Sequence, residues 1–320
     1  MESYVYKIIP LEEISRDFPY LCRYRMEDGA LADSVARHGL IQPLISIRSG
    51  HRILVSGHRR FRAAEKAGLG EISVFEIQKP LTPQELFLVS ILSNWNQIWS
   101  DLDRAWAVRK AARIFQFEEE AILRDILPAV GLAGEKHLYE EYLEVSDLDP
   151  AVLDLLDEGQ LPFRGVRVLS GFGKTDQREF ALSVATKLSL TTNQLLKTAE
   201  WLNDLLKINS VDLKSYLART PLAGLLNALQ EDRRQKTDQF TEALRRLRFP
   251  RLSDREEKFA SLSHEIREGA EDITIERPVF FEGEGITLKA SIKDSESVER
   301  ILELIQRKRK LLSSLFDIMV

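Results

Sequence analysis

Cysteine is nearly absent from this chain, and so are long apolar runs. Cys22 is the only cysteine in 320 residues, which excludes an intramolecular disulfide framework and a zinc site built on paired cysteines. No stretch approaches the roughly 18 apolar residues that span a bilayer, and the first residues lack a basic stretch followed by an apolar one. We therefore expect a cytoplasmic protein that makes no contact with a membrane.

Histidine is also sparse, and the net charge is negative. The five histidines are scattered, with no pair at metal-ligand spacing on one helix, so we expect no histidine-based metal centre. The formal charge of −5 disfavours wholesale, non-specific binding to nucleic acid, because neutralising phosphates requires a positive surface. Any contact with nucleic acid must therefore be local.

The apolar content is ordinary, and its patterning predicts an α+β protein. With 44% hydrophobic residues, the chain is long enough to form two or three domains, each with its own core. Residues 1–80 are predicted to form a small α+β domain, with helices at 29–37 and 59–67. Its strands are predicted at residues 4–9, 44–48, 52–56 and 71–78.

From residue 81 to about residue 230 almost every periodic segment is helical, which predicts an all-α domain. A helix over 121–130, a glycine-bounded turn and a second helix over 135–145 have helix-turn-helix spacing. Further helices are predicted at residues 148–163, 177–190 and 191–206. Residues 231–270 are dense in charge and predict a long helix or a linker.

The last fifty residues, 271–320, predict a small ββα domain. Two β-like runs at 273–281 and 285–292 flank a hairpin signal, and an amphipathic helix follows from Ser295. One side of this helix carries Val298, Ile301, Leu302, Ile305, Leu312 and Leu315. A single hairpin and one helix cannot bury both the sheet and this stripe, so we expect either packing on the helical domain or a homodimer, and we favour the homodimer.

The junction of the third strand and the second helix has the features of an anion site. Gly57 lets the backbone approach a ligand, and the amide groups of the helix start carry partial positive charge. Arg59, Arg60 and Arg62 follow in the first turns of the helix. Guanidinium groups can bind phosphate through two hydrogen bonds each, so this turn predicts a phosphate-binding site.

In order and spacing, residues 31–35, 38–44 and 55–64 resemble the N-terminal nucleotide-binding domain of the ParB partition proteins, a fold related to sulfiredoxin. The resemblance covers roughly residues 5–78. It implies that a cytosine nucleotide is contacted on its base side by Gly39, Gln42 and Pro43. It implies that the phosphates are held by Ser56, Gly57, His58, Arg59, Arg60 and Arg62.

Two positions depart from the family pattern. His58 stands where the family has a glutamate, and the second phosphate motif, near residues 93–102, lacks both its glutamate and its arginine. In one register Asn96 is the motif's asparagine and Trp99 takes the place of the arginine, and in another the asparagine is Asn94. The resemblance therefore implies CTP or another nucleoside triphosphate as ligand. It leaves open whether Mg²⁺ takes part and whether the chain is a weak nucleoside triphosphatase.

A weaker resemblance continues over residues 147–161 and 298–302, and it implies a nucleotide-dependent, DNA-binding homodimer of the chromosome- or plasmid-partition type. The second helix of the helix-turn-helix is acidic, which disfavours contact with phosphates. Candidate DNA-binding residues therefore lie elsewhere, at Arg164 and Arg167 and among the arginines of 233–251.

Two other functions stay open. One is a small-molecule kinase on the same fold, similar to free serine kinases, with Glu27, Asp28 or Asp33 as a base. The other is a degenerate protein-interaction factor that has lost DNA binding.

Overall fold

The computed structural model of the chain describes residues 3–25, 29–94, 97–228, 232–268, 273–278, 281 and 285–319. It divides into two compact units, Met1–Ala199 and Glu200–Val320. The first unit is mixed α+β at its amino end and helical beyond it, and the second is helical with a two-stranded sheet. The predicted α+β class is confirmed.

The amino-terminal part of the first unit is built on a four-stranded sheet of order β1-β4-β2-β3. β1 pairs antiparallel with β4, β2 pairs antiparallel with β3, and β2 and β4 are parallel. All four predicted strands are present, as β1 (Tyr4–Pro10), β2 (Leu44–Ser49), β3 (His51–Ser56) and β4 (Glu71–Ile77).

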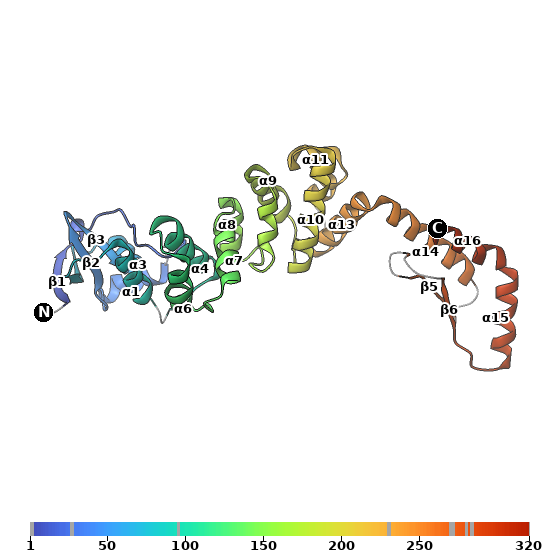
Figure 1. The fold of residues 1–320 in the computed structure, drawn as a ribbon, viewed down its shortest axis with the longest axis horizontal. Helices are drawn as coiled ribbons and strands as arrows, with labels where there is room; N and C mark the ends of the chain where they lie inside the picture. Colours follow the sequence, from blue (N-terminus) through green and yellow to red (C-terminus); the bar gives the residue numbers. More distant parts are fainter. Residues whose placement is uncertain are drawn as a thin grey trace. The chain divides into compact units, whose positions relative to one another are not determined.

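Helices cover both faces of this sheet, because its inner strands carry apolar residues on both sides. α1 (Gly29–His38) and α2 (His58–Lys66) pack on one face, where Phe61 contacts the cluster of Leu44, Leu54 and Val74. α3 (Pro83–Leu92) covers the other face and lies beside the strands in Figure 1. The sheet therefore shares a core with the helices that follow it.

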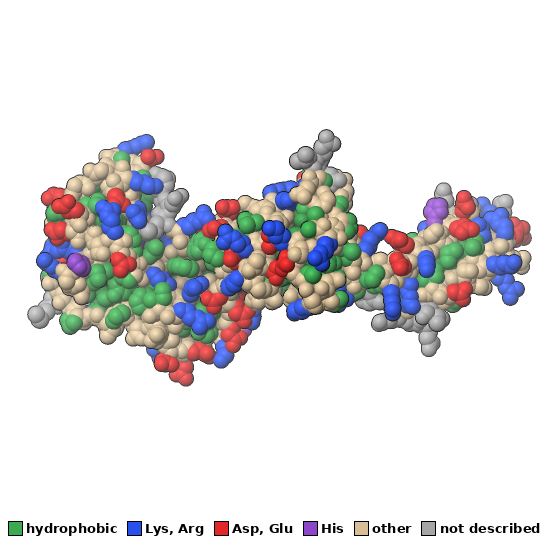
Figure 2. Space-filling model, turned by 90° about the horizontal axis from the view of Figure 1, so that it is seen from above, with side chains coloured by type: hydrophobic (Ala, Val, Ile, Leu, Met, Phe, Trp, Pro, Cys, Tyr) green, Lys and Arg blue, Asp and Glu red, His purple; other side chains and the backbone are tan. Residues whose placement is uncertain are grey.

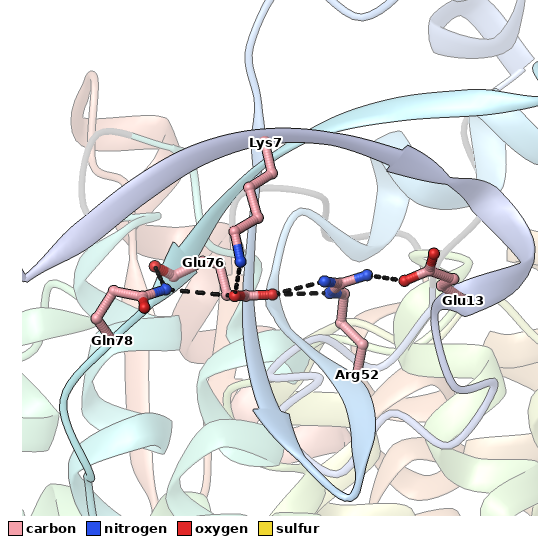
Figure 3. Close-up of polar contacts among 5 residues, drawn as sticks. All are labelled: Lys7, Glu13, Arg52, Glu76 and Gln78. Carbon is pink, nitrogen blue, oxygen red and sulfur yellow. Dashed lines mark hydrogen bonds and ion pairs between the residues drawn. The ribbon is translucent and has the colours of Figure 1, made fainter.

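A chain of charged groups crosses the sheet (Figure 3). The carboxylate of Glu76 on β4 accepts hydrogen bonds from Lys7 on β1 and from Arg52 on β3, the latter with Nη2 at 2.7 Å. Arg52 also donates to Glu13, in the 3₁₀ turn η1 (Leu11–Glu13), and Gln78 donates to Glu76 at 3.3 Å. Arg52 and Glu76 are both buried, so the pair is screened from water.

The rest of the first unit is helical, and it contains the predicted helix-turn-helix. Its first helix is α5 (Glu119–Ala121), continued by η3 (Ile122–Ile126) and α6 (Leu127–Ala129), and its second is α7 (Lys136–Ser146). The helix predicted over 148–163 was too long, because α8 (Pro150–Asp157) ends before Gly159, whose φ is +68°. The other elements are α4 (Asp101–Arg109), η2 (Lys110–Ile114), η4 (Val166–Gly171), α9 (Lys174–Glu179), η5 (Phe180–Ala185) and α10 (Thr192–Asn209), which runs into the second unit.

In the second unit, the charged stretch forms two helices rather than one. α13 (Arg233–Arg248) ends at Phe249, and α14 (Pro250–Arg267) begins with Pro250, which cannot continue a helix but suits a first turn. Phe259 and Ile266 of α14 belong to the same hydrophobic cluster as Ile273. The charged stretch therefore contributes to the carboxyl-terminal core. Two short helices precede it, α11 (Leu213–Arg219) and α12 (Leu222–Asn227).

The carboxyl end has the predicted ββα order but not the predicted single helix. β5 (Ile273–Glu276) and β6 (Thr287–Ala290) pair antiparallel, and residues 282–284 of the hairpin signal lie outside the described residues. The helical segment is split into α15 (Ser295–Arg307) and α16 (Arg309–Met319). The predicted stripe is divided as well, because Leu315 is buried whereas Leu302 is 55% exposed.

Candidate functional site

The phosphate turn predicted from the sequence lies at the junction of β3 and α2. Gly57 caps α2 with φ +95° and ψ +23°, a left-handed conformation that glycine adopts without strain. A Cβ at this position would lie 2.6 Å from Cδ2 of Leu44. Two features therefore favour glycine here, its backbone angle and the close approach of the buried Leu44 side chain.

A pocket of about 220 Å³ opens at this turn. Six residues predicted for nucleotide binding line it: Gln42, Gly57, His58, Arg59, Arg60 and Asn94. Residues that no motif indicated complete the lining: Leu21, Cys22, Arg23, Leu31 and Gln97. The pocket thus gathers residues from five separate segments of the chain around the amino end of α2.

Other predicted residues do not line the pocket. Arg62 donates to Glu65 at 3.0 Å, and its guanidinium lies 5.4 Å from the centre of the Phe18 ring. Ser56 is buried and accepts a hydrogen bond of 2.6 Å from the Ser93 hydroxyl. Gly39 and Pro43 are also absent from the lining. Asn96, and the alternative bases Glu27 and Asp28, lie outside the described residues.

Arg60 lies between the two predicted halves of the site. Its Nη1 donates to the backbone carbonyls of Gln42, at 3.0 Å, and of Pro43, at 2.9 Å. Burial lowers the pKa of Arg60 from its ordinary value, but an arginine remains charged at neutral pH. The guanidinium thus joins the start of α2 to the turn that precedes β2.

Positive charge concentrates in the pocket. Burial lowers the pKa of Arg59, repulsion from Arg23 lowers it further, and Asp103 opposes both effects. Arg23 itself donates to Asp103 at 2.8 Å, and its guanidinium lies 5.3 Å from the centre of the Trp99 ring. No local pattern singled out Arg23, because its partners are some eighty residues away in the chain.

The histidine at the family's glutamate position is buried and uncharged. His58 is 5% exposed, and burial, with repulsion from Lys110, lowers its pKa to about 3. Its ring meets Phe18 edge to face at 5.3 Å, and in the described part of the chain its Nε2 has no hydrogen-bond partner. Lys110 is buried nearby and donates to the carbonyls of Pro19 and Leu21.

The pocket offers little to a divalent cation. Mg²⁺ prefers carboxylate oxygens, and no aspartate or glutamate is among the described residues of the lining. Likewise, no three His, Cys, Asp or Glu side chains of the described ranges are placed to share a metal ion. The described residues of the lining therefore supply no carboxylate ligand for Mg²⁺.

The two candidate DNA-binding arginines differ in their surroundings. Both side chains are exposed, but Arg167 is held by Glu144 of α7 through two hydrogen bonds, of 2.5 and 2.8 Å. α7 also carries Glu140 and Glu141. Figure 2 shows acidic side chains along the helical part of the first unit, with basic ones among them. The helix-turn-helix therefore presents mixed charge.

No described helix is both long and apolar enough to cross a membrane. The structure combines an α+β domain, whose pocket is lined by three arginines, with a helix-turn-helix that follows it. The ParB N-terminal domain family matches residues 6–94. The chain thus contains a ParB N-terminal domain.

Curated relatives extend the similarity beyond that domain. The probable chromosome-partitioning protein ParB of Coxiella burnetii is 28% identical over 183 residues, which is 56% of this chain and 60% of the relative. Stage 0 sporulation protein J of Bacillus subtilis is 29% identical over 194 residues, 59% of this chain and 66% of the relative. The matches thus span 60% and 66% of these two relatives' own length.

Solved structures are more distant. The C-terminally truncated ParB of Caulobacter crescentus, complexed to the centromeric parS site, has a TM-score of 0.38 and 18% identity, covering 61% of this chain and 98% of that one. The same protein complexed with CTP-gamma-S has a TM-score of 0.25 and 19% identity, covering 55% of this chain and 97% of that one.

Proposed function

We propose that this chain is a partition-type protein that binds a nucleoside triphosphate in the α2 pocket and binds DNA as a homodimer in the cytoplasm. The observation that carries the proposal is the convergence of Arg23, Arg59 and Arg60 at the amino end of α2, around Gly57. The names of the curated relatives supply the partition role.

The phosphates are the part of the ligand for which the pocket is best equipped. A triphosphate carries several negative charges, and the pocket offers three guanidinium groups beside the positive end of a helix. Hydrogen bonds to charged groups contribute about 1.5–3 kcal/mol each. Losing one arginine should therefore weaken binding at least tenfold.

CTP is our first choice of nucleotide because of the family resemblance at Gly39, Gln42 and Pro43. We do not extend the proposal to hydrolysis. His58 is a buried, neutral imidazole where the family has a carboxylate, and it cannot replace a carboxylate as a ligand for Mg²⁺.

Calorimetry with CTP, ATP, ADP and GTP, with and without Mg²⁺, tests the proposal. We expect CTP to bind the wild type without Mg²⁺, and Arg59→Ala to weaken binding about tenfold or more. The control is Arg48→Ala, which removes the same charge from an exposed position on β2, outside the pocket. Equal affinity for CTP in the wild type and Arg59→Ala would contradict the site assignment.

A second candidate is a protein-interaction factor without DNA binding. The glutamates of α7, and the pairing of Arg167 with Glu144, favour this alternative because they leave little positive charge at the helix-turn-helix. Fluorescence anisotropy with labelled duplex DNA at low salt, with and without CTP, separates the two. Weak, steeply salt-dependent binding supports DNA binding, and no binding in either condition favours the second candidate.

A further inference from the structure

Arg60 differs from the other arginines of the pocket in its hydrogen-bond partners, which are backbone carbonyls of the base-side turn. Its Nη1 donates to two successive backbone carbonyls, those of Gln42 and Pro43. Its Nη2 would lie 3.3 Å from a Cβ built on Gly57. One guanidinium therefore touches the predicted base side of the pocket with one nitrogen and lies against the phosphate turn with the other.

We propose that Arg60 is a positioning residue that fixes the base-side turn relative to the phosphate turn and thereby sets the pocket's preference for a nucleotide over a bare polyphosphate. This inference rests on the proposed function, because it concerns the same pocket. It differs from the role that the family resemblance implies, in which Arg60 acts as one phosphate ligand among several.

The local backbone explains why such a residue is needed. Residues 39–43 join α1 to β2 and belong to no helix or strand, so no ladder of backbone hydrogen bonds holds them. The sheet begins only at Leu44. The planar guanidinium presents its N–H groups in a fixed geometry, and hydrogen bonds from a charged donor are among the stronger ones. The two bonds from Arg60 therefore hold the turn at a set distance from α2.

A positioning residue and a phosphate ligand predict different outcomes for different ligands. If Arg60 only supplied charge, its loss would weaken the binding of inorganic tripolyphosphate and the binding of CTP by the same factor. If Arg60 holds the base-side turn, the affinity for CTP falls by a larger factor than the affinity for tripolyphosphate. The contacts to the base depend on the turn, and tripolyphosphate makes no such contacts.

The experiment measures the binding of CTP, ATP and inorganic tripolyphosphate to the full-length chain by calorimetry. The variants are Arg60→Ala, Arg60→Lys and, as the matched control on the same turn, Arg59→Ala. We expect Arg59→Ala to weaken CTP and tripolyphosphate by similar factors. We expect Arg60→Ala to weaken CTP at least fivefold more than tripolyphosphate and to reduce the preference for CTP over ATP.

Arg60→Lys keeps the charge but cannot reproduce the planar fork, so it serves as the variant least disturbing to folding. We expect Arg60→Lys to bind tripolyphosphate with an affinity within about threefold of the wild type. We expect its affinity for CTP to fall by most of the additional factor seen in Arg60→Ala. In the absence of ligand, hydrogen exchange at residues 40–42 should be faster in Arg60→Lys than in Arg59→Ala.

Equal losses for CTP and tripolyphosphate in both Arg60 variants would overturn this inference and leave the proposed nucleotide site standing. A wild-type chain that binds neither ligand would overturn the proposed function, and this inference with it.

Discussion

At the scale of single residues, His58 shows how burial changes what a side chain can do. Its ring is buried against Phe18, and its pKa of about 3 keeps it neutral throughout the physiological range. The sequence alone presents this residue as neutral or cationic near pH 7. Its buried position makes it a neutral, largely apolar part of the pocket wall.

Burial of His58 predicts a pH dependence of stability. The ordinary pKa of 6.5 applies to the unfolded chain, so His58 is protonated there below pH 6.5. In the folded chain it stays neutral until the pH falls to about 3. The free energy of unfolding should therefore decrease as the pH is lowered. His58 should account for about 2 kcal/mol of this decrease between pH 7 and pH 5. Urea denaturation at both values measures this loss.

In His58→Gln this part of the loss should vanish. The control is His51→Gln, which changes an exposed histidine of β3. The same loss between pH 7 and pH 5 in the wild type and in His58→Gln would contradict the assignment.

At the scale of secondary-structure elements, the charged chain of Figure 3 ties together strands that are not all neighbours. β3 and β4 are separated by β2, yet Arg52 on β3 reaches Glu76 on β4. Burial alone would raise the pKa of Glu76, but hydrogen bonds from Lys7, Arg52 and Gln78 outweigh it and lower the pKa to about 2. The strand alternation predicted the sheet and gave no sign of this network.

Removing the carboxylate charge should destabilise the sheet. Glu76→Gln leaves the buried Arg52 guanidinium with Glu13 as its remaining carboxylate partner among the described residues, and we expect unfolding to require about 3 kcal/mol less at pH 7. The stabilisation is complete above the ordinary pKa of 4.5 and is lost as pH falls to about 2. The difference between wild type and variant should therefore shrink over that range.

Chemical denaturation at pH 7, 4 and 3 checks the prediction. Glu71→Gln, at an exposed position of the same strand, is the control and should change stability little. A Glu76→Gln variant as stable as Glu71→Gln at pH 7 would show that the network contributes nothing.

At the scale of the whole molecule, the exposed apolar side chains of the second unit bear on assembly. Leu302 of α15 is 55% exposed and Phe316 of α16 is 53% exposed, and Val298 is exposed as well. We propose that a second copy of the chain covers these residues. Light scattering during size-exclusion chromatography should then give a dimer at micromolar concentration.

Leu302→Asp combined with Phe316→Asp should give a monomer that still binds CTP, because the described pocket residues all lie in the first unit. Ile208→Asp places the same charge on another exposed apolar residue of the second unit and should remain dimeric. A wild-type monomer would contradict the proposal.

The packing of α14 decides where the chain can be truncated without breaking the carboxyl-terminal core. Deleting residues 271–320 alone would strip Phe259 and Ile266 of their packing partners in the carboxyl-terminal core. A truncation that retains the pocket should therefore end before α14, at residue 249.

The sequence by itself determined the local features of this protein. The four strands, the glycine turn before α2 and the helix-turn-helix were all predicted, because strand alternation, glycine and helix periodicity are properties of neighbouring residues. The phosphate turn and the Gln42-Pro43 segment were predicted from such patterns together with the family resemblance.

Only the tertiary structure decided which side chains meet. It brought Arg23 to the pocket, set Arg62 against the Phe18 ring and placed Arg60 against the carbonyls of Gln42 and Pro43. It also placed α14 in the carboxyl-terminal core. Such contacts depend on how elements pack and on which rotamers that packing leaves open, and local periodicity carries no record of either.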